Sequence, residues 1–118
     1  MRARMGWLCI LALAMPAGAA DFPERALRII VPFSAGGTGD VLARLISEEL
    51  FKAWNKPAVV INRDGADTIL GVDLAAKSSP DGHTLLIGPT AMAINSGLGR
   101  ALPYDLRKDL DPVTFALS

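Results

Sequence analysis

The sequence predicts an α/β fold in which a mostly parallel sheet carries helices on its faces. Short apolar runs rich in β-branched residues alternate with amphipathic segments, and small-residue turns separate them. That alternation is typical of parallel strands joined by right-handed crossovers. Hydrophobic residues make up 51% of the chain, and its twelve basic residues balance twelve acidic ones. This composition indicates a globular protein and argues against a nucleic-acid partner, which usually requires a basic face.

The first twenty residues have the pattern of a secretory signal peptide. Arg2 and Arg4 form a positive start, Trp7–Met15 an apolar centre, and Ala17–Ala20 a small-residue cleavage site. The apolar centre is well short of the ~20 residues that a membrane span needs. We therefore expect an exported protein with a signal peptide at residues 1–20 and one α/β unit at residues 21–118.

The segment Leu27–Arg44 organises the predicted fold and the predicted site. Its apolar start indicates a buried strand, and the turn Ser34–Gly39 leads to Asp40, which we expect to cap a helix ending near Trp54. The turn glycines should permit positive φ and leave backbone amides uncovered. Those amides and the positive end of the helix dipole predict a site for an anion.

The helix of residues 40–54 should turn an apolar stripe toward the sheet, made of Val41, Leu42, Leu45, Ile46, Leu50 and Trp54. Its opposite face carries charges at i,i+4 spacing, which we interpret as a solvated surface; these are Arg44, Glu48 and Lys52.

The remaining predicted elements alternate in the same way along the chain. In order they are a strand at Pro57–Ile61, a loop at Asn62–Thr68, a helix at Ile69–Ser78, a turn at Ser79–Gly82, a strand at Thr84–Ile87, a loop at Gly88–Thr90, a short helix near Met92–Leu98 and the start of a fourth strand at Asp111–Leu117. Ligands of such sheets bind outside the carboxyl ends of the strands, so we expect the three loops after the strands to converge there.

Two nucleotide-binding interpretations fail on particular residues. Gly37 and Gly39 match the first pair of a dinucleotide fingerprint, but Leu42 occupies the third glycine position. The acid expected after the second strand is replaced by Asn62, and the first loop and helix start contain no lysine for a phosphate-binding P-loop.

The sequence also offers no catalytic residue, metal ligand set or cofactor motif. His83 is the single histidine and has no second metal-ligating cluster. Ser34 lacks both the Gly-x-Ser-x-Gly context and a partnering base, so we expect its hydroxyl to make one hydrogen bond, to the turn or to a ligand.

A series of short motifs runs in order through the mature chain: Phe22–Arg25, Val31–Asp40 with Ala43-Arg44, Val60–Arg63 with Gly65-Ala66, Gly71, Pro80–Leu86, Ala93–Asn95, Leu102–Asp105 and Asp111–Val113. In these motifs the chain resembles the tripartite tricarboxylate transporter receptor family, the Bug-type solute-binding proteins. The resemblance implies a non-enzymatic periplasmic receptor whose two α/β lobes close on a small carboxylate like a Venus flytrap. It also implies delivery of that ligand to a membrane permease or to a sensory system.

The family's binding loops map onto the predicted turns of this chain. The ligand-binding residues that the resemblance implies are Phe33, Ser34, Ala35, Gly36, Gly37, Thr38, Asp40, Asn62, Gly65, Ala66, Asp67, Thr68 and Thr90. Within this set, Asp40 would have its charge engaged at the helix start, so that it does not repel an anion.

The chain departs from the family pattern in three respects. The second loop reads Arg63-Asp64-Gly65-Ala66-Asp67-Thr68 where the family usually has Arg-Pro-Gly-Ala-Gly-Gly, and His83 replaces the usual tyrosine. The chain also ends before a second lobe, so we expect an N-terminal lobe only. Two alternatives stay open, namely a secreted α/β enzyme domain and an inactive truncated fragment.

Asp67 has two competing interpretations. Facing the ligand, it would repel a carboxylate; pointing away, it would cap the following helix by accepting from the amides of Ile69 and Leu70.

Overall fold

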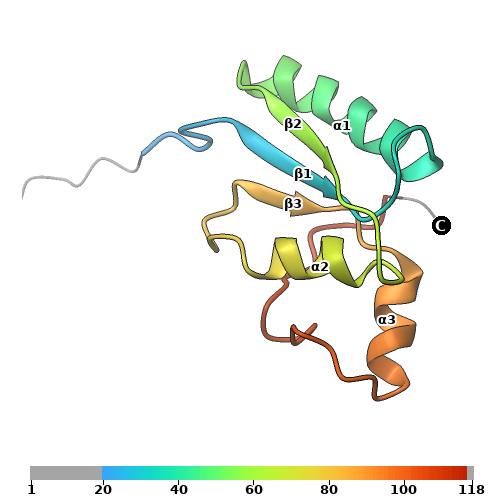
Figure 1. Cartoon of the computed structure of the whole chain (residues 1–118). Helices are drawn as coiled ribbons and strands as arrows, with labels where there is room; N and C mark the ends of the chain where they lie inside the picture. Colours follow the sequence, from blue (N-terminus) through green and yellow to red (C-terminus); the bar gives the residue numbers. More distant parts are fainter. Residues whose placement is uncertain (1–19, 117–118) are drawn as a thin grey trace, which may run out of the picture.

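A computed structural model describes residues 20–116 (Figure 1). The predicted signal peptide, apart from Ala20, lies outside these residues. The described elements are β1 (Leu27–Val31), α1 (Thr38–Trp54), β2 (Ala58–Asn62), α2 (Ile69–Ala76), β3 (Thr84–Leu86) and α3 (Thr90–Gly97).

The three strands form one parallel sheet in the order β2-β1-β3. In the register, Leu27 lies opposite Ala58 and Val31 opposite Asn62, while Arg28 lies opposite Thr84. The carboxyl ends of β1 and β2 therefore meet at one edge of the sheet. The predicted α/β class with a parallel sheet is confirmed.

The two faces of the sheet are covered by different helices, α1 on one side and α2 on the other (Figure 1). Leu27, Ile29 and Val31 are fully buried and pack in one cluster with Ala43 of α1. Alternation along the strand directs Ile30 to the opposite face, where α2 carries the fully buried Val72. The central strand is thus buried on both faces, which explains its continuous apolar run.

α1 begins earlier than predicted, because Gly37 and not Asp40 is its N-cap residue. Gly37 is extended, with φ −81° and ψ 175°, and Asp40 lies in the first helical turn, where a negative charge complements the helix dipole. The other end of α1 is close to the prediction: Asn55 adopts the left-handed conformation, and its amide donates to the Phe51 carbonyl at 2.8 Å.

The predicted apolar stripe of α1 is wrong in part. Leu42, Ile46 and Leu50 are half-buried, and Ile46 and Leu50 pack on the core cluster. The other three members, Val41, Leu45 and Trp54, are all more than two-fifths exposed. Because β2 is the outermost described strand on this side of β1, the sheet covers only part of the apolar surface of α1.

α2 packs closely against the chain that leaves β1 and β2. A Cβ on Gly71 would lie 2.6 Å from the Pro32 Cβ and 2.7 Å from the Arg63 carbonyl oxygen. Only glycine permits this approach, which places the start of α2 directly against both loops of the candidate site.

The fourth strand expected from Asp111 onward is absent from the described part of that segment, residues 111–116. Its apolar side chains are open to solvent: Val113 is 81% and Phe115 95% exposed. A strand needs a hydrogen-bonding neighbour, and the sheet formed by the described residues supplies none to this segment. Among the described residues, no helix has both the length and the apolar character required to span a bilayer.

Candidate ligand-binding site

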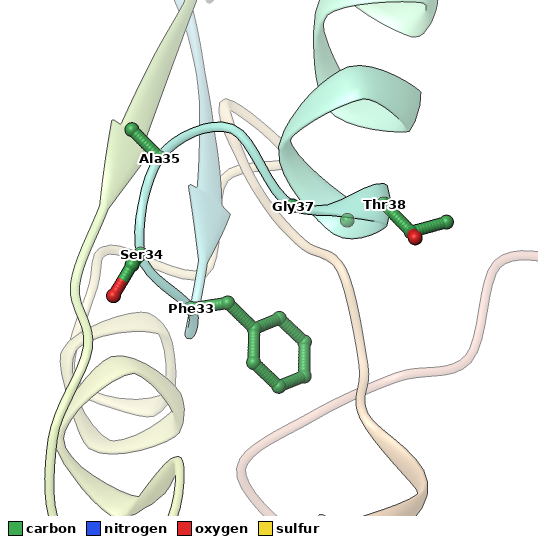
Figure 2. Close-up of a pocket in the computed structure, with 6 residues that line it drawn as sticks. Phe33, Ser34, Ala35, Gly37 and Thr38 are labelled. Atoms are coloured by element: carbon green, nitrogen blue, oxygen red, sulfur yellow. The ribbon is translucent and has the colours of Figure 1, made fainter.

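The loop between β1 and α1 lines an open pocket of about 380 Å³ at the carboxyl edge of the sheet (Figure 2). Its lining residues are Phe33, Ser34, Ala35, Gly37, Thr38 and Gly39. In Figure 2 the Phe33 ring lies below the first turn of α1, while the Ser34 hydroxyl points to the other side of the loop. The ring approaches so closely that a Cβ on Gly39 would be 3.2 Å from Phe33 Cδ2.

The first turn of α1 offers uncapped backbone amides to this pocket. No side chain caps the helix, and the first amide bonded within it is that of Val41, which donates to the Gly37 carbonyl at 3.0 Å. The amides of Thr38 and Gly39 precede it and have no intrahelical acceptor by geometry. Of the turn glycines Gly36, Gly37 and Gly39, Gly36 alone uses the positive φ that glycine permits, at 91°. The amide of Gly36 is not free, because it donates to Asp40 Oδ2 at 3.0 Å.

Asp40 is almost fully buried and connects the parts of the site. Its Oδ2 accepts from the Gly36 amide and from Arg44 Nε at 3.1 Å, and its Oδ1 accepts from Asn62 Nδ2 at 3.0 Å. The Arg44 hydrogen bond, followed by those from Gly36 and Asn62, lowers the pKa of Asp40 to about 2. The carboxylate is therefore charged but engaged, as expected, although by partners other than the predicted amides of its own helix. Arg44, interpreted as a solvated charge, is one of those partners.

The second loop is tied to the first by side-chain hydrogen bonds. Asn62, at the end of β2, donates through Nδ2 to the Phe33 carbonyl at 3.3 Å as well as to Asp40. Ser34 Oγ donates to Asp64 Oδ2 at 2.5 Å, and Asp64 Oδ1 accepts from the Gly65 amide at 2.7 Å. The expectation that Ser34 bonds its own turn or a ligand is wrong, because its hydroxyl donates to the neighbouring loop. Asp64, which accepts this bond, is a site residue that was not predicted.

The segment 65–68 has an unusual backbone. Gly65 has φ 126°, and three residues that are not glycine follow at positive φ: Ala66 at 49°, Asp67 at 54° and Thr68 at 71°. Thr68 is the N-cap residue of α2 but makes no capping hydrogen bond, and its buried Oγ1 has no partner. Asp67 does not cap α2 either, because its carboxylate contacts Arg100 Nη1 at 3.1 Å. The capping interpretation of Asp67 is therefore wrong.

The remaining predicted residue, Thr90, is exposed at the first position of α3 and does not line the pocket. The pocket brings together five predicted residues from the first loop, and the second loop is joined to it through hydrogen bonds.

His83 lies away from these loops, buried just before β3 with its ring against Phe22. Among residues 20–116, no cluster of three or more His, Cys, Asp or Glu side chains could hold a metal ion.

Comparison with known proteins identifies the family to which this geometry belongs. Residues 42–117 match the family described as the tripartite tricarboxylate transporter family receptor. The chain belongs to this receptor family. Among curated proteins, it is 37% identical over 110 residues to Protein BugT of Bordetella pertussis, an alignment that covers 92% of this chain and 34% of BugT.

Solved structures show the same family fold. A protein described as a periplasmic transporter superimposes with a TM-score of 0.72 at 39% identity, over 79% of this chain and 32% of that one. MatC from Rhodopseudomonas palustris, solved with bound malate, superimposes with a TM-score of 0.54 at 42% identity, over 57% of this chain and 23% of MatC. The chain spans about a third of the length of the curated relatives it matches. The resemblance to the receptor family is confirmed, and the family is one of solute receptors rather than enzymes.

Proposed function

We propose that this chain is the N-terminal lobe of a periplasmic receptor and that it captures a small carboxylate on the first turn of α1. The observation that carries this proposal is the uncapped start of α1, which faces a pocket, while both carboxylate oxygens of Asp40 in the same turn accept hydrogen bonds within the protein. An anion placed there would accept hydrogen bonds from the Thr38 and Gly39 amides and meet the positive end of the helix dipole.

In this proposal the predicted residues have different tasks. The residues of the first loop hold the carboxylate through backbone amides, and Asn62 fixes that loop by bonding Phe33 and Asp40. The residues from Gly65 to Thr68 form the wall beside it, and Thr90 faces the more distant part of the ligand. Residues 1–20 direct export, and the captured ligand passes to membrane permease subunits or to a sensory system.

The class of ligand is supported by the family and by one neighbour. The family is that of tricarboxylate transporter receptors, and the MatC structure contains malate, a small dicarboxylate. We therefore choose malate as the probe. Two charge-assisted hydrogen bonds contribute about 3–4 kcal/mol together, so the affinity of the chain should be in the millimolar range.

The proposal is tested by titrating the uniformly ¹⁵N-labelled chain with malate and following its amide resonances. The amides of Gly37, Thr38 and Gly39 should shift in a saturable way, while those at the far end of α1, such as Lys52, should not move. Malamide, the uncharged diamide of malate, is the matched control and should leave all of them unchanged. Saturable shifts elsewhere in the chain with none at the start of α1 would contradict the assignment of the site.

A further inference from the structure

A hydrogen-bonded cluster joins α3 to the second loop of the site. Asn95 is 2% exposed, and its Nδ2 donates to the Asp67 carbonyl at 3.3 Å. Its Oδ1 accepts from Arg100 Nη1 at 2.7 Å, and the same nitrogen contacts Asp67 Oδ2 at 3.1 Å. The backbone amide of Arg100 also donates to the Asn95 carbonyl, at 3.3 Å. We call these three residues, Asp67, Asn95 and Arg100, the α3 clamp, after the helix that carries Asn95.

The clamp contacts a segment, residues 65–68, whose backbone conformation its own sequence does not favour. Three consecutive residues at positive φ are not glycine, and each such residue costs about 1–2 kcal/mol relative to a right-handed conformation. Thr68 is β-branched, which makes the left-handed region especially unfavourable, and its buried hydroxyl has no partner. Such a conformation persists only where surrounding contacts hold it.

The clamp residues lie where they can hold this strained conformation. Both the carbonyl and the side chain of Asp67 are bound, so the middle residue of the left-handed turn is held at two atoms. Asn95 is buried on α3, which lies beside the start of α2 in Figure 1, and so provides a fixed anchor. On the other side of the turn, Asp64 binds Ser34 of the pocket, which links the conformation of residues 65–68 to the first loop.

We propose that Asn95 and Arg100 are positioning residues, which hold segment 65–68 in its left-handed conformation and thereby set the affinity of the pocket for carboxylates. This inference rests on the proposed function. Arg100 acts through Asp67 and does not itself contact the ligand. Its ion pair with Asp67 also explains how a carboxylate can lie in a loop beside an anion site, since the guanidinium compensates the charge.

The variants Arg100→Gln and Asp67→Asn distinguish two roles for Asp67: positioning of the loop through the clamp, and simple repulsion of the ligand carboxylate. Repulsion by Asp67 would make malate bind more tightly in Asp67→Asn and more weakly in Arg100→Gln. If the clamp positions segment 65–68, malate should bind about threefold more weakly to each single variant. The double variant should then bind malate no more weakly than either single variant. Lys52→Gln removes a comparable exposed ion pair, with Glu49, far from the loops, and should leave the affinity unchanged.

A conformational readout distinguishes positioning from general stabilisation. Residues at positive φ show strong intraresidue HN–Hα NOEs, which Ala66, Asp67 and Thr68 should display in the wild-type chain without ligand. Arg100→Gln should weaken them while the protein stays folded, and Arg100→Lys should restore them in part. NOEs that persist in Arg100→Gln, or NOEs lost without a change in malate affinity, would overturn the inference. Failure of the wild-type amides at the start of α1 to respond to malate would instead refute the proposed function, and the positioning role with it.

Discussion

Replacing Gly71 by alanine should destabilise the protein, although the substitution places a better helix former inside α2. The new Cβ would lie 2.6 Å from Pro32 Cβ, 2.7 Å from Pro32 Cα and 2.7 Å from the Arg63 carbonyl oxygen. Carbon atoms pack best at about 3.5–4.0 Å, so roughly 1 Å of separation is missing. The obstructing atoms belong to backbone and to a proline ring, which cannot rotate away.

The magnitude follows from two opposing contributions. Overpacking of this kind costs about 1–3 kcal/mol, and the higher helix propensity of alanine returns up to about 1 kcal/mol. The free energy of unfolding should therefore fall by about 1–2 kcal/mol. For a domain of this size, that corresponds to a melting temperature lower by roughly 5–15 °C.

The assay is thermal and urea unfolding followed by circular dichroism. Gly97→Ala is a matched control, because it makes the same substitution in the equally short α3, where a Cβ would meet nothing within 4 Å. The control should be as stable as the wild type or slightly more stable. If Gly71→Ala melted at or above the wild-type temperature, the close packing of α2 against the two loops would be refuted.

Three further outcomes are expected. Ala66→Gly should stabilise the chain by about 0.5–1 kcal/mol in urea unfolding, because relief of the left-handed strain exceeds the added entropy cost of glycine; a loss of stability would contradict the strain. The lowered pKa of Asp40 means that its contribution to stability is present above its unfolded value of 3.8 and is lost as the pH falls toward about 2. The melting temperature of Asp40→Asn should therefore fall less than that of the wild type between about pH 4 and pH 2. An equal fall in both proteins would count against the hydrogen bonds that Asp40 accepts from Gly36, Arg44 and Asn62. N-terminal sequencing of the exported protein should begin at Ala20 or Asp21, and a mature protein beginning with Met1 would refute the signal peptide.

The order and type of the described elements were largely predictable, because local patterns determine them. The apolar run of β1, the glycine-rich turn and the polar loop after β2 each carry a signal within a few residues. The start of α1 was misplaced because Asp40 resembles an N-cap in sequence, yet its carboxylate reaches back to the Gly36 amide and to Arg44. Sequence alone gives the residue type but not which neighbouring amide it bonds.

The less predictable features depend on contacts between distant residues. Asp67 and Arg100 are 33 residues apart, and although their charges are opposite, nothing in the sequence selects this pair from the other acidic and basic residues. The left-handed turn of Ala66, Asp67 and Thr68 has little local signal, because none of the three is glycine and Gly65, which adopts positive φ freely, lies before them. The predicted apolar stripe on α1 was wrong in part for a similar reason. The number of strands beneath the helix decides which of its apolar residues are covered.

Thr38→Pro is the sharpest test of whether backbone amides at the start of α1 hold the carboxylate. Proline is well tolerated at the first position of a helix, and Gly37 before it is already extended, so the fold should survive while one amide donor is removed. Thr38→Ala is the matched control, because it removes the hydroxyl and keeps the amide. Malate affinity measured by NMR titration should fall about tenfold or more in Thr38→Pro and stay near wild type in Thr38→Ala. Equal malate affinity in the two variants would show that the Thr38 amide does not hold the carboxylate.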